Sequence, residues 1–322
     1  MKTVLLPEPI RPEGQRVLEG RVRIVEAPDY TPDTLKKCIR EAHGVILRTR
    51  ARITAEMIAE APHLQVIART GAGVDNIDVK AATERRIYVC HVPDANVVSV
   101  AEHVITLLLA LSKQLKILDK EVHRGNFAIR YQYLSRELSG KTLGIIGLGK
   151  IGREVAERGG KGLGMKVVTF DPYISAQEAI RFGAEPCNSL KEMLAQSDAV
   201  TLHVPLTEET RKLMGAGEFR SMKPSAWFIN TSRGGLVDEA ALIEALDSGV
   251  IAGAGLDVFE SEPLDSNSPL TRFSNVILTP HVAGLTNESS IRMAVAAAEA
   301  VLDVLEGRLP AHVFNRNELM DH

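Results

Sequence analysis

Three polar side chains that follow predicted β-strands have the types needed to bind a carboxylate and to move a proton: Arg233, Glu262 and His281. A guanidinium holds a carboxylate through two parallel hydrogen bonds and polarises a neighbouring carbonyl group. An imidazole titrates near neutral pH, so it can give or take the proton of a hydroxyl group. A carboxylate beside the imidazole fixes the orientation of the ring and favours its charged form. Each residue alone could be an ordinary loop side chain, so this interpretation requires the three to meet at one edge of a sheet.

A glycine-rich turn predicts where a nucleotide would bind. A short apolar run ends at the pattern G-x-G-x-x-G, formed by Gly147, Gly149 and Gly152, and a helical pattern follows. In dinucleotide-binding proteins the first glycine allows a tight turn, the second lets the backbone approach a pyrophosphate, and the third lets the helix pack against the strand. The N-terminus of that helix also presents free N–H groups and a positive dipole end to the phosphates. A glycine-rich turn of another α/β protein is the alternative interpretation.

An acidic residue supports the nucleotide interpretation and indicates the cofactor. Asp171 ends the next apolar run, 19 residues after Gly152, where a carboxylate can accept hydrogen bonds from the adenosine ribose hydroxyls. Pro172 and Tyr173 follow it rather than an arginine, so a 2′-phosphate would be repelled and left unpaired. We therefore expect NAD rather than NADP. With the arginine, the carboxylate and the histidine, this predicts hydride transfer between a nicotinamide and a 2-oxo acid.

The order of apolar and helical segments predicts an α/β fold with two doubly wound parallel sheets. We expect a Rossmann NAD-binding domain, residues 99–286, inserted into a discontinuous flavodoxin-like substrate domain. The substrate domain would combine residues 1–98 with a C-terminal helix and tail, residues 287–322. One long apolar helix is expected from Ser99 to about Lys120. The strands expected in the NAD-binding domain are 143–147, 167–171, 199–204, 227–231, 254–258 and 276–279.

Composition excludes several classes of protein. The chain has 322 residues, a charged content of 25% and a net charge of −3, which offers no basic surface for nucleic acid or for an anionic membrane. The longest apolar run, Val104–Leu111, is too short to cross a bilayer, and the N-terminal residues lack the apolar centre of a signal peptide. Three scattered cysteines without metal-like spacing indicate a cytoplasmic protein without a metal site, and Cys90 is expected to be a core residue.

Several segments, in order and over nearly the whole chain, resemble the D-2-hydroxyacid dehydrogenase family, which includes phosphoglycerate, hydroxypyruvate (glycerate) and D-lactate dehydrogenases. The resemblance implies two α/β domains hinged around a cleft, and reversible NAD-dependent reduction of a 2-oxo acid to the (R)-2-hydroxy acid. It also implies a homodimer, formed through the polar stretch 123–139, where aromatic residues and arginines suit a subunit interface; an ordinary surface loop is the alternative. The segments are RTGAGVDNID at 69–78, AEHVITLLLAL at 101–111, GKTLGIIGLGKIG at 140–152, LHVPLTEET at 202–210, INTSRGGLVDEAALIEAL at 229–246, AGAGLDVFESEP at 252–263 and LTPHVAG at 278–284.

The resemblance also implies roles for individual residues. Arg233 would bind the substrate, His281 would be the acid/base group, and Glu262 would orient the imidazole. Asp171 would hold the adenosine ribose and Asp257 the nicotinamide amide. Arg233 and His281 would also border the cofactor, and His281 would also contact the substrate. Further residues that would line the cofactor are Gly147, Gly149, Lys150, Ile151, Gly152, Val204, Pro205, Thr231, Ser232 and Gly284, and those that would contact the substrate from the first domain are Arg48, Ala72, Gly73 and Asn76.

The side chain of the substrate stays open. Arg48 lies where the resemblance places an arginine near the phosphate of a phosphoglycerate dehydrogenase substrate, and Arg50, Arg52 and Arg69 are close in sequence. That cluster indicates a second anionic group on the substrate, such as the phosphate of 3-phosphohydroxypyruvate. If these arginines instead face solvent, hydroxypyruvate or glyoxylate fits the chain equally well.

Two other functions are alternatives within the same fold. Corepressors of the C-terminal-binding-protein type keep the Arg-Glu-His set but use NAD(H) to support oligomerisation and partner binding, so a corepressor-like NAD(H)-sensing protein is the main alternative. A formate-dehydrogenase-like function is disfavoured, because that branch has glutamine in place of the glutamate, whereas Glu262 is present here.

Overall fold

The computed structural model describes residues 1–320 and divides the chain into two compact units. The first unit combines residues 1–96 with the segment that begins at Leu285, and the second unit spans Val97–Gly284. The domain boundaries expected from the sequence, 98/99 and 286/287, each lie two residues after the observed boundaries, 96/97 and 284/285. At the first crossing the reason is local: helix α5 begins at Val97 rather than at Ser99, so the helix and its unit start together.

A parallel sheet forms the centre of the first unit. Within residues 1–320 it has five strands in the order β2-β1-β3-β4-β5, the order of flavodoxin-like folds. This confirms the fold predicted for the substrate domain. The strands are β1 (Thr3–Leu6), β2 (Arg23–Glu26), β3 (Gly44–Leu47), β4 (Val66–Arg69) and β5 (Tyr88–Cys90), and the helices are α1 (Pro12–Leu18), α2 (Pro32–Ile39), α3 (Ala55–Ala59), α4 (Val79–Glu84), α12 (Asn287–Leu305) and α13 (Arg316–Met320).

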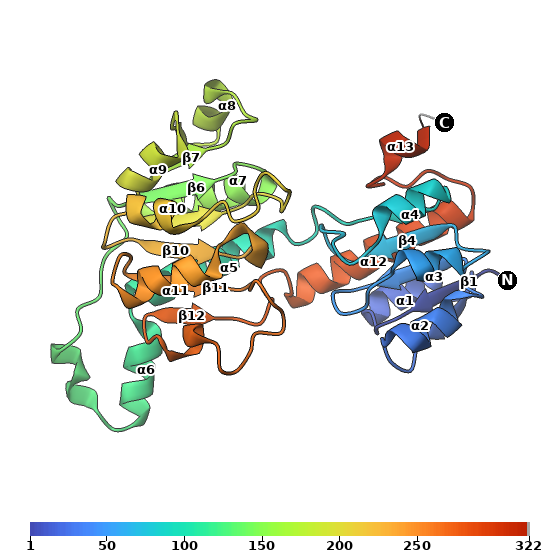
Figure 1. Ribbon diagram of the computed structural model, residues 1–322, viewed down its shortest axis with the longest axis horizontal. Coiled ribbons are helices and arrows are strands. Elements are labelled where there is room, and N and C mark those ends of the chain that lie inside the picture. The colour runs from blue at the N-terminus through green and yellow to red at the C-terminus, as the bar shows by residue number, and fades with distance from the viewer. Residues whose placement is uncertain (321–322) are drawn as a thin grey trace. The chain divides into compact units, whose positions relative to one another are not determined.

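Both faces of this sheet are buried, and successive strand residues alternate between two cores. Val4, Ile46 and Val66 belong to one core, which also contains the alanine-rich stripe of α12, whereas Leu5 and Val45 belong to the opposite core. Helix α12 packs against α1, β3 and β4, and Figure 1 shows this red helix among the blue elements of the unit. The C-terminal segment therefore completes a core that the N-terminal residues begin.

The cysteine beside a histidine, Cys90, is part of that core. It is buried on β5, and burial raises the pKa of its thiol to about 12. A thiolate nucleophile does not form there at neutral pH. Cys90 is the core residue that the sequence predicts.

A wider parallel sheet forms the centre of the second unit. In the described part of the chain it has seven strands in the order β12-β11-β10-β9-β6-β7-β8. The order changes direction between β6 and β9, the kind of switch point at which doubly wound sheets bind ligands. This confirms the prediction of a Rossmann-type domain. The strands are β6 (Thr142–Ile146), β7 (Lys166–Phe170), β8 (Glu185–Pro186), β9 (Ala199–Leu202), β10 (Trp227–Asn230), β11 (Gly253–Leu256) and β12 (Val276–Leu278).

The sequence predicted six of these strands and missed β8. This edge strand has two residues, Glu185 and Pro186, and both are exposed. A strand without apolar residues leaves no periodic signal in the sequence. The helices of the unit are α5 (Val97–Ser112), α6 (Leu115–His123), α7 (Lys150–Glu157), α8 (Ala176–Arg181), α9 (Leu190–Gln196), α10 (Ala216–Ser221) and α11 (Glu239–Asp247), with the short helical turns η1 (Phe127–Tyr131), η2 (Arg158–Gly162), η3 (Gly234–Leu236) and η4 (Pro269–Arg272).

The prediction of a single long helix from Ser99 to about Lys120 is wrong. The structure has two helices, α5 and α6, which are bent by 62° relative to each other. Gln114 between them has a φ of 54°, in the left-handed region, so the α-helical path is interrupted there. Helix α5 buries an apolar stripe, whereas none of the α6 residues is buried, and α6 with the following stretch projects from the body of its unit in Figure 1. Within residues 1–320, no helix alone is long and apolar enough to cross a bilayer, and only the bent pair α5 and α6 reaches that length and composition.

Candidate active site

The residues expected to bind a nucleotide and to perform chemistry follow the carboxyl ends of strands in the second unit. Because these strands are parallel, their carboxyl ends meet at one edge of the sheet. The glycine-rich turn follows β6, Asp171 follows β7, Val204 and Pro205 follow β9, Thr231 to Arg233 follow β10, Asp257 follows β11, and His281 follows β12.

His281 and Glu262 form a hydrogen-bonded pair. The Nδ1 atom of His281 lies 2.7 Å from Oε2 of Glu262, and the two side chains are 33% and 34% exposed. The backbone N–H of Phe259 donates to Oε1 of Glu262 at 3.2 Å. An ionised carboxylate only accepts hydrogen bonds, so Nδ1 of His281 carries a proton. The Nε2 atom is therefore the ring position that can exchange a proton with a ligand.

The charge of Glu262 is set by its neighbours. Burial alone would raise the pKa of this carboxyl group, but the hydrogen bond and charge of His281, the N–H of Phe259 and the charge of Arg233 outweigh it. The pKa of Glu262 therefore lies below its ordinary value of 4.5. The carboxylate is ionised at neutral pH. The turn of Arg233 packs on the loop of Glu262, because a Cβ on Gly234 would overlap the carbonyl oxygen of Phe259. The structure thus brings together the three residues that the sequence singled out.

Arg233 stands directly before η3, in a turn that a buried amide holds. Its Nη1 atom donates to the carbonyl of the preceding residue at 2.7 Å, and its own carbonyl accepts from Nδ2 of Asn230 at 2.9 Å. Asn230 is 1% exposed, so the turn is fixed from inside the protein. A Cβ at Gly234 would overlap the backbone carbonyl of Phe259. Only glycine lets the arginine turn pack this closely on the loop that carries the glutamate.

Asp257 anchors the loop that carries His281. Its carboxylate is 0% exposed and accepts the N–H groups of Val282 at 2.9 Å and Ala283 at 2.8 Å, while the hydroxyl of Thr279 donates to it at 2.6 Å. The N–H of His281 also donates to the backbone carbonyl of Asp257 at 2.8 Å. Together these bonds hold His281 at a φ of 54°, a left-handed value that is uncommon for a residue with a side chain. The contact of Asp257 with a nicotinamide amide stays a prediction.

The glycine-rich turn fits a dinucleotide. Gly147 has a φ of 89°, and a Cβ at Gly152 would overlap the carbonyl of Gly147, so the turn and the close helix both require glycine. Apart from Gly149 and its two chain neighbours, no atom of the described residues lies within 4 Å of a Cβ built on Gly149, so the turn is open to a ligand on that side. Oδ2 of Asp171 accepts the N–H of Leu148 at 2.8 Å. The acid expected to hold a ribose therefore lies beside the turn expected to hold the phosphates.

A buried hydroxyl group at the same edge has no protein partner within residues 1–320. This is Oγ1 of Thr231, a residue that is 8% exposed. An unpaired buried hydroxyl costs about 1–3 kcal/mol, a cost that a polar cofactor group would remove. The hydroxyl of Ser232 instead donates to the carbonyl of Leu202 at 2.8 Å. The residues present fit a bound dinucleotide.

The remaining residues expected to line the cofactor also lie around this edge. Lys150 and Ile151 begin α7, and Ile151 is partly buried against the core beneath it. The side chain of Val204 packs against Gly147, and the carbonyl of Pro205 accepts the hydroxyl of Thr210 at 2.7 Å. Gly284 is the last residue of the second unit. The cofactor contacts of these residues stay predictions.

His203, after β9, is a partly exposed residue that the sequence did not single out. Its Nε2 atom lies 3.0 Å from Oγ1 of Thr201, and its Nδ1 atom is buried with no hydrogen-bond partner in the described part of the chain. Burial lowers the pKa of His203 from 6.5 to about 3, so the ring is neutral at physiological pH. Its carbonyl also packs against Gly147. The only signal in the sequence was its place in the segment LHVPLTEET.

In the first unit, Arg48 belongs to a loop that a buried carboxylate holds. Glu8 is 7% exposed and accepts the N–H groups of Arg48 at 3.2 Å, Arg50 at 3.2 Å and Ala51 at 3.1 Å. The Nδ2 atom of Asn76 donates to the carbonyls of Arg48 at 2.9 Å and Ala51 at 2.7 Å. These amides bind Glu8, so an anionic ligand of this loop would rely on side chains. In this structure the amide nitrogen of Asn76 supports the Arg48 loop.

The other first-unit residues expected near a substrate lie in the loop after β4. The carbonyl of Ala72 accepts a hydrogen bond from Nδ1 of His91 at 2.8 Å, and Gly73 is the next residue. Of the additional arginines, Arg50 and Arg52 are exposed, as the solvent-facing alternative expects. Substrate contacts of this loop stay predictions.

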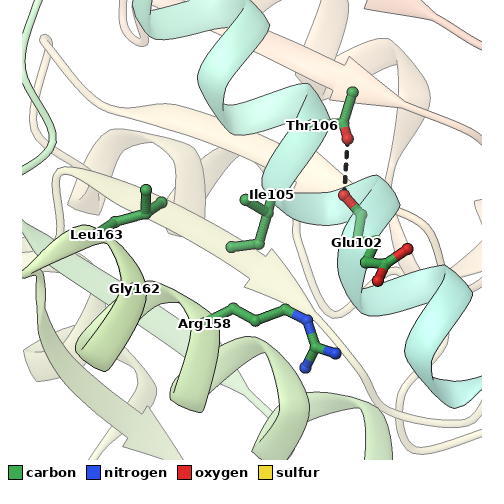
Figure 2. Close-up of a pocket in the computed structure, with 6 residues that line it drawn as sticks. All are labelled: Glu102, Ile105, Thr106, Arg158, Gly162 and Leu163. Carbon is green, nitrogen blue, oxygen red and sulfur yellow. Dashed lines mark hydrogen bonds between the residues drawn. The ribbon is translucent and has the colours of Figure 1, made fainter.

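A surface hollow lies elsewhere in the second unit. Its volume is about 460 Å³. In Figure 2, Ile105 points into the space between α5 and η2, and the hydroxyl of Thr106 donates to the carbonyl of Glu102. The lining residues are Glu102, Ile105, Thr106, Arg158, Gly162 and Leu163, and none of them belongs to the predicted site. We therefore place the chemistry at the strand edge, where the acid/base pair and the open glycine turn lie.

Comparisons with known proteins agree with this geometry. Residues 105–283 match the family described as D-isomer specific 2-hydroxyacid dehydrogenase, NAD binding domain. The chain is 40% identical over 307 residues to the D-3-phosphoglycerate dehydrogenase of Archaeoglobus fulgidus, covering 94% of this chain and 57% of that protein. It is 38% identical over 322 residues to the glyoxylate reductase of Aeropyrum pernix, covering 97% of this chain and 96% of that protein. The structure of D-lactate dehydrogenase from Aquifex aeolicus, complexed with NAD and lactic acid, is similar with a TM-score of 0.86 at 30% identity, covering 97% of this chain and 99% of that one.

Proposed function

Because this chain belongs to the D-isomer specific 2-hydroxyacid dehydrogenase family, we propose that it catalyses the reversible, NAD-dependent reduction of a 2-oxo acid to the (R)-2-hydroxy acid. The observation that carries the proposal is the hydrogen bond between His281 and Glu262, together with the close packing of the Arg233 turn on the loop of Glu262. An anion-binding guanidinium beside an oriented imidazole is the set that a 2-oxo acid requires. The chain spans 57% of the length of the phosphoglycerate dehydrogenase and 96% of the glyoxylate reductase.

In the proposed reaction, Arg233 binds the carboxylate of the 2-oxo acid and polarises the adjacent carbonyl. His281, in its charged form, donates the proton on Nε2 to the carbonyl oxygen. The nicotinamide cofactor supplies the hydride when bound. Glu262 holds the other ring proton and stabilises the imidazolium before the transfer. In the oxidation direction, neutral His281 accepts the proton of the hydroxyl group at the same atom.

We propose NAD rather than NADP as the cofactor. Asp171 lies beside the glycine turn with its carboxylate already tied to the N–H of Leu148. A fixed negative charge there favours ribose hydroxyls and repels a 2′-phosphate. The residues that follow, Pro172 and Tyr173, provide no positive charge to offset the repulsion.

The substrate side chain defines two versions of this function. The relatives include a D-3-phosphoglycerate dehydrogenase and a glyoxylate reductase, so 3-phosphohydroxypyruvate and hydroxypyruvate or glyoxylate are the substrates to compare. In the first version, the Arg48 side chain binds the phosphate, because Glu8 occupies the backbone amides of its loop. In the second, Arg48 contacts a hydroxyl or carboxylate group.

The direct test is oxidation of NADH by the purified protein with a panel of 2-oxo acids. The panel contains 3-phosphohydroxypyruvate, hydroxypyruvate, glyoxylate, pyruvate, sulfopyruvate and 2-oxoglutarate, each also measured with NADPH. Saturable turnover of one of them, faster with NADH, supports the proposal and separates its two versions. NADH binding without turnover of any 2-oxo acid would instead favour the corepressor-like alternative.

We further propose that the protein is a homodimer formed through the stretch 123–139. Phe127, Tyr131 and Leu134 in this stretch are 67%, 80% and 83% exposed. Arg130 lies over the rings of Phe127 and Tyr131 at 5.7 Å and 5.3 Å. Aromatic residues and arginine are the types enriched in subunit interfaces. Sedimentation equilibrium measures the mass directly, and a monomer at micromolar concentration would contradict this assignment.

A further inference from the structure

His103, on helix α5, is joined to the loop of His281 by a chain of hydrogen bonds. The Nε2 atom of His103 lies 3.0 Å from Oγ1 of Thr279, two residues before His281. Oγ1 of Thr279 lies 2.6 Å from Oδ1 of Asp257, and Nε2 of His103 is 3.7 Å from that same oxygen. The side chain of His103 is 19% exposed and that of Asp257 is 0% exposed. The chain thus runs from a partly exposed helix residue to a fully buried carboxylate.

The direction of each bond follows from the number of available protons. The carboxylate of Asp257 accepts two backbone N–H groups as well as the hydroxyl of Thr279. That hydroxyl has one proton, which it donates to the carboxylate of Asp257 in a short hydrogen bond. Oγ1 of Thr279 must then accept from His103, so His103 carries a proton on Nε2. A side chain at position 103 can therefore replace histidine only if it offers an N–H at that place.

The hydrogen bonds from His103 to Asp257 act on a backbone segment, around His281, that requires stabilisation. His281 has a left-handed φ of 54°, and such a conformation costs free energy and persists only when neighbouring groups hold it. Thr279 before it and Val282 and Ala283 after it all bind the carboxylate of Asp257. His103 fixes the Thr279 end of this arrangement. The hydrogen bond between His103 and Thr279 joins residues that are 176 positions apart. It therefore connects the first helix of the second unit, α5, to the loop that ends at Gly284, the last residue of that unit.

We propose that His103 is a positioning residue for proton transfer. By donating to Thr279, it keeps the threonine hydroxyl directed at Asp257 and so keeps the imidazole of His281 in place. This inference rests on the proposed function, because it concerns the geometry of the proposed acid/base step. A histidine that only stabilises the fold would make the same hydrogen bond, and the two roles differ in what a substitution changes.

The test compares His103→Gln, His103→Asn and His103→Leu in the full chain. Glutamine carries its amide nitrogen as many bonds from Cβ as Nε2 of histidine, whereas asparagine carries it at the Nδ1 position and leucine has no donor. We expect kcat of the glutamine variant to stay within about threefold of wild type, and kcat of the other two to fall about 10- to 100-fold. KM for the 2-oxo acid, the Kd for NADH and the melting temperature stay close to wild type.

A double-mutant cycle with Thr279→Val tests whether the hydrogen bonds from His103 through Thr279 to Asp257 act as a unit. Valine removes the hydroxyl at nearly constant volume, so His103→Leu should lower kcat by less than about threefold when added to it. The matched control is His63→Leu, an exposed histidine of the first unit whose ring stacks on His43. This control should leave kcat unchanged.

Three outcomes would contradict the inference. Unchanged kcat in His103→Leu would overturn it and leave the proposed function intact. Equal losses of kcat, NADH affinity and melting temperature in all three variants, glutamine included, would assign His103 a structural role and also overturn it. A wild-type protein that binds NADH but reduces no 2-oxo acid would overturn the proposed function and this inference with it.

Discussion

Glu262 accepts a hydrogen bond from Nδ1 of His281 at 2.7 Å, although the two residues follow different strands of the sheet. The bond fixes which ring nitrogen faces the carboxylate, and it leaves Nε2 for proton exchange. The pKa of Glu262 is lowered below 4.5 even though burial alone would raise it. Glu262 is therefore an ionised carboxylate throughout the physiological pH range.

Replacement of His281 by alanine should lower kcat by about 10²- to 10⁴-fold, the usual contribution of general acid–base catalysis. The Kd for NADH should stay within about threefold of wild type, because the glycine turn and Asp171 are unchanged. Stopped-flow NADH oxidation and fluorescence titration measure the two quantities. Normal turnover in this variant would contradict the proposed acid/base role.

Glu262→Gln should make the reduction more sensitive to rising pH. The proton donor is the imidazolium, and the glutamine no longer stabilises its charge, so the reduction rate should fall at a lower pH than in wild type. We expect kcat at pH 7 to drop about 10- to 100-fold. Because the pKa of Glu262 is lowered in the folded state, its stabilising contribution is complete above the ordinary pKa of 4.5 and is lost only as pH falls through the lowered value. A pH–rate profile from pH 5 to 9 checks the expected change in rate, and identical profiles would contradict it. Denaturant titration of both proteins at pH 7 and below pH 4.5 checks the contribution of Glu262 to stability.

Asp171→Ala should relax the preference for NAD. The substitution removes the carboxylate that repels a 2′-phosphate, so the ratio of kcat/KM for NADH to that for NADPH should fall at least about tenfold. The matched control is Asp247→Ala, an exposed carboxylate at the end of α11. An unchanged cofactor ratio would remove Asp171 from the ribose site.

Glu8→Gln should loosen the loop that carries Arg48. An amide cannot accept these N–H groups as well as a carboxylate does, because its NH₂, placed at either oxygen position, would face at least the N–H of Arg50. We expect a loss of about 1–3 kcal/mol in the free energy of unfolding and a higher KM for the preferred 2-oxo acid. Denaturant titration and steady-state kinetics measure these effects, with the exposed Glu19→Gln as control. A variant as stable as wild type would contradict the support that we assign to Glu8.

His203→Gln should reduce the loss of stability at acidic pH. The folded-state pKa of about 3 lies below the ordinary 6.5, so the unfolded chain binds a proton first as pH falls, and stability decreases from pH 6.5 downwards. The limiting slope is about 1.4 kcal/mol per pH unit, and the partly exposed residue should give less, about 1 kcal/mol between pH 7 and pH 5. Glutamine can still bind Thr201 but does not titrate in this range. Equal pH dependence in both proteins would contradict burial of the neutral ring.

Much of the fold could be predicted from the sequence because parallel strands buried on both faces read as short apolar runs. Gly147 and Gly152 indicated the nucleotide-binding turn in the sequence, because the positive φ of Gly147 and the close packing at Gly152 both require glycine. The edge strand β8 and the bend at Gln114 gave no such signal. A two-residue exposed strand has no periodicity, and one left-handed residue does not alter the local composition.

The sequence by itself determined the fold class of doubly wound parallel sheets, the glycine-rich turn, and the chemical types of Arg233, Glu262 and His281. These features depend on each residue and its near neighbours in the chain. Tertiary structure alone decided which ring nitrogen of His281 binds Glu262, that Glu8 occupies the amides of the Arg48 loop, and that His103 reaches Thr279. These partners are far apart in the chain, and their pairing depends on packing of whole elements. Local periodicity carries no information about which distant side chain will meet a given atom.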